Sequence, residues 1–127
     1  MVSFESFVQT DGAPIYLQII RHIKQGIAAG TVSDGEEMPS RRVLSALLGV
    51  NPNTVQKAYR LLEEEGLITS HSGAKSYLSL TAEKVAAVRT ELMEGVVRTL
   101  VGAVKGMGVS REEALSLLEK LWDEEVR

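Results

Sequence analysis

The segment Asn51–Glu64 carries a strong helix signal and constrains how its neighbours can fold. Asn51 is a favoured N-cap, because its side-chain oxygen can accept a hydrogen bond from a free N–H of the first turn. Pro52 then occupies the first helical position, where its missing N–H removes no hydrogen bond. Gly66 can adopt the positive φ that ends a helix. The sequence therefore predicts a capped helix of about four turns.

The predicted helix has an apolar face and a polar face. The apolar side chains follow helical spacing and are Val55, Ala58, Tyr59 and Leu62. The polar face consists of Asn53, Gln56, Lys57 and Arg60. Amide side chains match the donor–acceptor pair of adenine in a major groove, and cations match guanine or phosphate. An isolated amphipathic helix is more often a solvated surface helix, so the neighbouring segments decide between these interpretations.

A second short helix is predicted directly before this one. Ser40 can cap a helix over Arg41–Leu48, and Gly49 ends it. Only Val50 and Asn51 then precede the next helix. Two helices joined by a turn of three or four residues with a glycine form a helix-turn-helix.

A helix over Ile15–Ala29, opened by Pro14 and ended by Gly30, precedes this pair. After Gly66, alternating segments on both sides of Gly73 predict a β-hairpin. Three helices followed by a hairpin predict a winged helix-turn-helix domain. The core residues that we expect in it are Ile20, Ile23, Ile27, Leu44, Leu47, Val55, Ala58 and Leu62.

The rest of the chain predicts two longer helices. Thr81 caps the first, which extends to about Lys105 or Met107, and a capping box beginning at Ser110 opens the second, which extends to about Val126. Two helices with broad apolar stripes cannot cover each other fully, so we expect an antiparallel pair that dimerises with a second copy. Packing on the winged domain in a monomer is the alternative. The predicted dimer residues are Val85, Val88, Leu92, Val96, Leu100, Val104, Leu115, Leu118 and Trp122.

Glycines and chain segments complete the predicted organisation. Gly95 and Gly102 lie on one side of the long helix, where another helix could approach closely. The predicted fold class is mostly α with a small β-hairpin: a winged helix-turn-helix domain followed by a two-helix antiparallel dimerisation tail. We place a partly disordered extension at residues 1–13, the winged domain at 14–80 and the dimerisation domain at 81–127.

The chain's net charge of −3 is unfavourable for a nucleic-acid binder, but the charge is unevenly distributed. Between Met38 and Leu62 there is no acidic residue. The bases in that segment are Arg41, Arg42, Lys57 and Arg60. A local basic face, rather than the total charge, determines phosphate binding. Arg41 is expected to be exposed to solvent rather than to contact DNA.

Composition and residue types argue against several other functions. The chain has no cysteine, and its only histidines are His22 and His71, so neither a thiolate metal site nor a catalytic cluster is indicated. We expect no enzymatic activity, no metal and no tightly bound cofactor or small molecule. No segment resembles a secretory signal or a membrane span, and a cytoplasmic location is expected.

Residues 14–80 resemble the DNA-binding domain of the GntR family of bacterial transcription regulators. The resemblance rests on PSRRVLSALLGV (Pro39–Val50), NPNTVQKAYRLLEEEGLI (Asn51–Ile68) and the hairpin with Gly73. The NPNTV run and the short helical tail resemble the YtrA subfamily. Some members carry arginine at the positions of Pro52 and Gln56, so their base preferences are not transferred to this chain.

The resemblance implies that DNA is contacted by the start of the second helix, the recognition helix and the wing. By position, the implied contact residues are Ser40, Arg42, Asn53, Thr54, Gln56, Lys57, Ser72 and Gly73. Arg60 and Lys75 are added because they lie on the same polar face and on the hairpin.

The expected function is that of a homodimeric repressor that binds a palindromic operator in double-stranded DNA. Asn51–Glu64 would enter the major groove and the 70–76 hairpin would form the wing. The family parallel suggests control of the protein's own gene and of neighbouring transporter genes. A protein- or RNA-binding module is the alternative, but the polar face lacks the aromatic or aliphatic anchors that such partners need.

Overall fold

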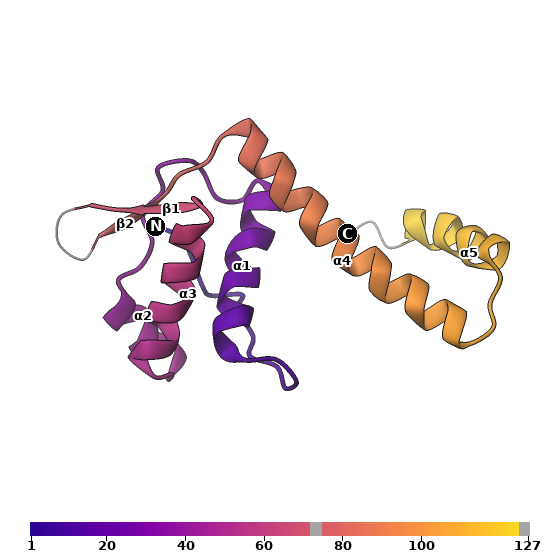
Figure 1. Cartoon of the computed structure of the whole chain (residues 1–127), viewed down its shortest axis with the longest axis horizontal. Coiled ribbons are helices and arrows are strands. Elements are labelled where there is room, and N and C mark those ends of the chain that lie inside the picture. Colours follow the sequence, from indigo (N-terminus) through magenta and orange to yellow (C-terminus); the bar gives the residue numbers. More distant parts are fainter. Residues whose placement is uncertain (72–74, 125–127) are drawn as a thin grey trace. The chain divides into compact units, whose positions relative to one another are not determined.

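The computed structural model describes residues 1–71 and 75–124 (Figure 1). Its elements are α1 (Ile15–Ala29), α2 (Arg41–Leu48), α3 (Pro52–Glu64), β1 (Ile68–Ser70), β2 (Ser76–Leu78), α4 (Ala82–Gly106) and α5 (Arg111–Glu124). The predicted fold class, a mostly α winged helix-turn-helix followed by a helical C-terminal region, is confirmed. The chain divides into two compact units, the first of which is Met1–Thr90.

The core of the first unit lies where α1 and α2 pack against α3. Its buried helical residues are Ile19, Ile20, Ile23, Ile27, Leu44, Val55, Ala58, Tyr59 and Leu62. The predicted core is therefore confirmed except for Leu47, whose exposed fraction is 66%. The short helix α2 turns only Leu44 and Ser45 inward, and Leu47 shares the outer side with Val43, one turn away.

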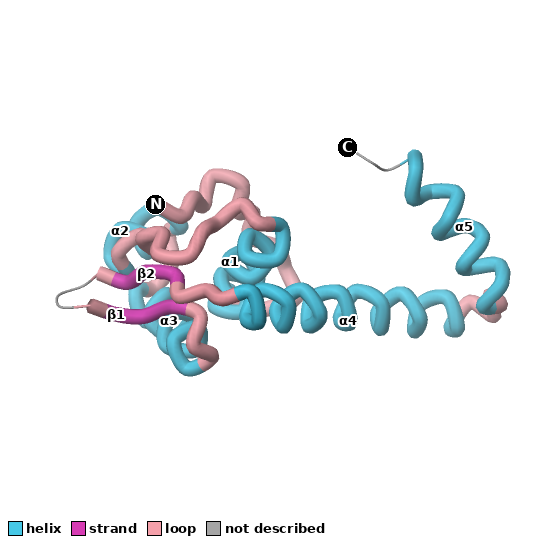
Figure 2. The backbone as a smooth tube through the Cα atoms, turned by 90° about the horizontal axis from the view of Figure 1, so that it is seen from above, coloured by secondary structure: helices cyan, strands magenta, loops and turns pink. Residues whose placement is uncertain are grey.

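The strands β1 and β2 lie side by side as a hairpin (Figure 2). They pair in antiparallel register, with Ile68 opposite Leu78 and Ser70 opposite Ser76. A third extended segment, residues 36–38, lies beside β2. The N–H of Leu78 donates to the carbonyl of Glu36 over 2.8 Å. The polar and turn-forming composition of this segment gave no strand signal in the sequence. The predicted turn residues Ser72 and Gly73 lie outside the described residues.

The segment of residues 1–13, expected to be partly disordered, belongs to the first unit, and its beginning packs against the rest of that unit. Val2 and Phe4 are each only 5% exposed. The N–H of Val2 donates to the carbonyl of Glu37 over 2.9 Å, and the ring of Phe4 lies 4.5 Å from that of His22 on α1. Burial of apolar side chains holds this segment on the unit. Its position near the end of the chain gave no indication of that burial.

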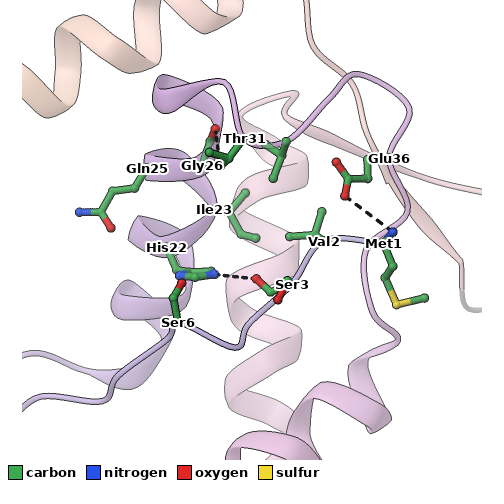
Figure 3. Close-up of a pocket in the computed structure, with 11 residues that line it drawn as sticks. Met1, Val2, Ser3, Ser6, His22, Ile23, Gln25, Gly26, Thr31 and Glu36 are labelled. Carbon is green, nitrogen blue, oxygen red and sulfur yellow. Dashed lines mark hydrogen bonds and ion pairs between the residues drawn. The ribbon is translucent and has the colours of Figure 1, made fainter. Parts of the chain in front are cut away.

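A hollow of about 420 Å³ is lined by this N-terminal segment, by α1 and by the loop that follows α1 (Figure 3). His22 Nε2 lies 2.9 Å from the carbonyl oxygen of Ser3 at its edge. The N-terminal amine of Met1 forms a longer ion pair with Glu36, at 3.7 Å. The bond to Ser3 and the ring contacts with Phe4 and Phe7 make His22 part of the packing between the segment and α1.

The beginning of α4 belongs to the first unit, which extends to Thr90, beyond the boundary expected after residue 80. Val88, predicted to be a dimer residue, is 4% exposed and is buried within this unit. The ammonium of Lys84 donates to the carbonyl of Gly66 over 2.6 Å. The apolar stripe of α4 keeps the same spacing on both sides of the boundary between the units. The sequence pattern therefore could not distinguish Val88 from the other predicted dimer residues.

The second unit begins at Glu91. The capping box that opens α5 is confirmed by reciprocal 3.1 Å hydrogen bonds between Ser110 and Glu113. Hydrogen bonding to the Glu113 carboxyl, first from the backbone N–H of Ser110 and then from the Ser110 side chain, lowers its pKa. No described residue of α5 is buried. A Cβ added at Gly95 or Gly102 would meet nothing within 4 Å, so the described chain supplies no close helix there.

Candidate nucleic-acid interface

The turn between α2 and α3 is held by Ser45, which is 7% exposed. Its hydroxyl donates to the carbonyl of Val50 over 2.6 Å, and Val50 N–H donates back to the carbonyl of Ser45 over 3.1 Å. Gly49 adopts φ +68°, which side chains other than glycine rarely tolerate. The predicted cap of α3 is confirmed, because Asn51 Oδ1 accepts from Asn53 N–H at 2.7 Å. These contacts in the turn therefore fix the direction of α3 relative to α2.

Tyr59 anchors the middle of α3 to the inside of the unit. Its buried hydroxyl donates a 2.6 Å hydrogen bond to the carbonyl of Pro39. Burial raises the pKa of the Tyr59 hydroxyl well above its usual range, and the positive charge of Arg41 opposes that rise. The guanidinium carbon of Arg41 lies 5.2 Å from the ring centroid. Arg41 is therefore packed on Tyr59, and the expectation that solvent surrounds it is wrong.

The opposite face of α3 is the candidate reading surface. Asn53, Gln56, Lys57 and Arg60 are all exposed, and Thr54 is half-buried. The structure thus places four of the predicted contact residues on one outward face, as their spacing indicated. The face carries amide donors and acceptors beside two cations, the groups that can meet base edges and phosphates in a groove.

Two further predicted contact residues lie at the start of α2. The hydroxyl of Ser40 accepts from Val43 N–H at 3.1 Å and so caps the helix. Arg42 is exposed. Ser40 therefore has a defined structural role, whereas Arg42 remains available to an anionic partner.

The two cations of α3 differ in their surroundings. Arg60 pairs with Glu64 at 2.8 Å, and their side chains are 52% and 59% exposed. The spacing of four residues could have revealed this pair. The Lys57 ammonium lies 4.1 Å from the ring centroid of Tyr16 on α1. No sequence signal joined those two residues, because they lie on different helices.

The hairpin carries two further polar residues, His71 directly after β1 and Lys75 directly before β2. The N–H of His71 donates to the carbonyl of Lys75 over 2.9 Å, which extends the antiparallel pairing. The ring of His71 meets that of Tyr77 edge-on at 5.0 Å. His71 therefore packs on the hairpin, and Lys75 is the exposed cation beside it.

The predicted dimer residues other than Val88 are half-buried or exposed. Val85, Leu92 and Val104 are half-buried, and the exposed ones are Val96, Leu100, Leu115, Leu118 and Trp122. Neighbouring apolar residues, Met93, Val97, Val101, Leu117 and Leu121, are exposed as well. The second unit thus displays more apolar surface than a solvated helix normally carries.

Two other features are absent from the described part of the chain. Nowhere in residues 1–71 and 75–124 do three or more acidic or histidine side chains gather as metal ligands. Within the same residues, every helix is too short or too polar to cross a membrane.

Comparison with known proteins identifies a family and several relatives. The family described as "Bacterial regulatory proteins, gntR family" matches residues 15–78. The HTH-type transcriptional repressor YtrA of Bacillus subtilis (strain 168) is 36% identical over 115 residues, which cover 89% of this chain and 84% of that protein.

Solved structures are similar as well. A GntR family transcriptional regulator from Listeria monocytogenes superposes with a TM-score of 0.79 at 28% identity, covering 88% of this chain and 98% of that one. YtrA from Sulfolobus acidocaldarius, a GntR-family transcription factor, superposes with a TM-score of 0.54 at 26% identity, covering 94% and 100%.

Proposed function

The chain belongs to the gntR family of bacterial regulatory proteins, and on that premise we propose that it is a homodimeric repressor that binds a palindromic operator in double-stranded DNA. The observation that carries this proposal is the outward face of α3. That face is polar and basic, and it is mounted on a helix that is capped by Asn51 and anchored by Tyr59. It supports insertion of α3 into a major groove.

The residues of the reading surface take different roles in this proposal. Asn53 and Gln56 are exposed amides that can form paired hydrogen bonds with a base edge. Lys57 and Arg42 are exposed cations that position the backbone through phosphates. Arg60 contributes to the same face after its contact with Glu64 is exchanged for a phosphate.

Three further residues are assigned to positions around the reading surface. Lys75 is the exposed cation of the wing, next to the predicted contact residues Ser72 and Gly73, which lie outside the described residues. Thr54, half-buried near the start of α3, contributes its hydroxyl at the edge of the surface. We assign Ser40 a backbone contact in addition to its capping role.

Dimerisation is proposed because the second unit exposes an apolar surface that a monomer leaves in water. Val96 and Leu100 on α4 and Trp122 on α5 are 61%, 41% and 71% exposed. Covering each Å² of such surface is worth about 25 cal/mol. A symmetric dimer is the commonest way to cover a self-complementary apolar face, and it would present two copies of α3 to a palindrome.

The biological role follows from the family and is also a proposal. The B. subtilis relative is named a transcriptional repressor, and we infer repression for this chain too. We propose a cytoplasmic protein without enzymatic activity or a tightly bound small molecule, which controls its own gene and neighbouring transporter genes.

Selection of binding sites from random duplex DNA by the full-length protein tests this proposal. The expected product is a palindrome whose half-sites are separated by about one helical turn or a multiple of it. Sedimentation of the free protein and of its complex with the selected duplex then gives the stoichiometry, and two chains per duplex are expected. Selection of single-stranded RNA in preference to the duplex, or one chain per asymmetric site, contradicts the proposal.

A further inference from the structure

Lys57, the cation at the centre of the reading surface, has a defined neighbour on another helix. Its ammonium lies 4.1 Å from the centroid of the Tyr16 ring. This distance is within the roughly 6 Å over which a cation is attracted to an aromatic face. Lys57 is exposed and Tyr16 is half-buried, so the contact lies at the surface of the unit, beside α3.

Tyr16 is half-buried and begins a well-anchored helix, whereas Lys57 is exposed, so the ring is the more constrained of the two side chains. Tyr16 lies in the first turn of α1. In the same turn, the side-chain amide of Gln18 donates to the carbonyls of Thr10 and Ala13, each over 2.8 Å, and so ties the preceding segment to the helix. The N–H of Thr10 donates back to Gln18 Oε1 over 2.9 Å. The long, flexible side chain of Lys57 therefore takes its position from the ring.

The contact leaves the charge of Lys57 available. Among the described residues, no carboxylate forms an ion pair with Lys57, whereas Arg60 on the same face is paired with Glu64 at 2.8 Å. An ammonium has three N–H donors, and a ring face on one side leaves the others directed toward solvent. A phosphate can thus bind Lys57 without displacing an anion.

We propose that Tyr16 is a positioning residue for DNA binding: its ring holds the Lys57 ammonium in the place where it meets a phosphate of the DNA backbone. The inference rests on the proposed function of α3. Ordering a long side chain before association reduces the entropy that binding must offset, and this is the advantage that the ring supplies.

The test compares four variants on the duplex selected by the wild-type protein: Tyr16→Leu, Tyr16→Phe, Lys57→Gln and the double variant of Tyr16→Leu with Lys57→Gln. Tyr16→Leu removes the aromatic face and Tyr16→Phe, the matched control, keeps it. The dissociation constant should rise about two- to fivefold for Tyr16→Leu and change by less than about twofold for Tyr16→Phe. In a Lys57→Gln background, Tyr16→Leu should have no further effect, because the cation that it positions is absent.

A spectroscopic measurement on the free protein separates positioning from general packing. The side-chain protons of Lys57 nearest the ammonium should show an upfield ring-current shift that is kept in Tyr16→Phe and lost in Tyr16→Leu. Thermal unfolding of each variant reports any change in stability. A structural role alone would leave the losses from Tyr16→Leu and Lys57→Gln additive.

Each outcome decides between the proposals. Additive losses, or an equal loss in Tyr16→Phe, overturn the role of the ring while leaving the proposed function intact. A wild-type protein that binds no duplex overturns both, since there is then no phosphate for Lys57 to meet. Coupled losses together with the ring-current shift establish Tyr16 as the positioning residue.

Discussion

The hydroxyl of Tyr59 donates a 2.6 Å hydrogen bond to the carbonyl oxygen of Pro39, twenty residues earlier in the chain. The bond joins the centre of α3 to the residue just before the cap of α2. Both Tyr59 and Pro39 are buried, so water cannot replace either partner. This bond therefore helps to set the distance between the centre of α3 and the start of α2.

Replacing Tyr59 by phenylalanine should lower the free energy of unfolding by about 1–2 kcal/mol, because the buried carbonyl of Pro39 loses that donor. Urea denaturation followed by circular dichroism measures the change. Tyr77→Phe is the control, since Tyr77 is only half-buried and its ring contact with His71 is retained. Equal losses in the two variants would show that the Pro39 bond has no particular importance.

Alkaline pH should destabilise the protein through the same residue. Burial raises the pKa of the folded Tyr59 hydroxyl above its ordinary value of 10.0, so the unfolded chain releases this proton first. The contribution of Tyr59 is complete below about pH 10 and is lost as the pH rises beyond that value. Unfolding free energies measured between about pH 8 and 11 should fall less steeply in Tyr59→Phe. Parallel curves would contradict this explanation.

The exposed amides and the cation of α3 should differ in how they affect specificity. Gln56→Ala and Asn53→Ala should each weaken operator binding by about 1–3 kcal/mol and leave binding to random duplex almost unchanged. Lys57→Ala should weaken both and reduce the salt dependence of binding. Fluorescence anisotropy titrations at several salt concentrations measure all three. A uniform loss on both DNAs for Gln56→Ala would show that Gln56 does not read bases.

Truncation should separate folding from dimeric binding, and the structure determines where to cut. A chain ending at Thr90 keeps Val88 and Lys84 in the first unit, so it should retain the winged fold as a monomer. Its operator affinity should fall by about 10²–10⁴, because the second contact is no longer intramolecular. Sedimentation and a binding titration test this. The idea fails if the full-length chain is a monomer at micromolar concentration or if the cut chain binds as tightly.

A chain ending at Leu80 is the informative comparison for this truncation. It loses the buried side chain of Val88 and the bond from Lys84 to Gly66. Its free energy of unfolding should therefore be lower than that of the longer fragment by about 2 kcal/mol or more. Equal stability of the two fragments would place the unit boundary back at residue 80.

The N-terminal segment should contribute to stability through Phe4. Phe4→Ala should lower the free energy of unfolding by about 3 kcal/mol, because a ring that is only 5% exposed leaves a cavity. Val8→Ala in the same segment is the control, with a change within about 0.5 kcal/mol, since Val8 is 73% exposed. Chemical denaturation of both variants provides the measurement. An unchanged free energy of unfolding in Phe4→Ala would show that the segment does not pack through Phe4, as expected for a disordered extension.

Local features of the sequence determined the helical elements of this protein and the face of α3. Asn51, Pro52 and the Ser110–Glu113 capping box act on N–H groups within a few residues, so their effect can be recognised without knowing the rest of the fold. The spacing of Asn53, Gln56 and Lys57 places them on one side of any helix, and the family motifs then indicated what that side is for.

Contacts between distant segments were decided by tertiary structure alone. Spacing cannot tell that Leu47 faces water while Val88 is buried, because each helix repeats its pattern regardless of what packs against it. The pairing of Lys57 with Tyr16 and the burial of Phe4 on α1 depend on which surfaces meet after folding. Burial depends on which surfaces pack together in the folded chain, and it cannot be deduced from a residue's neighbours in the sequence.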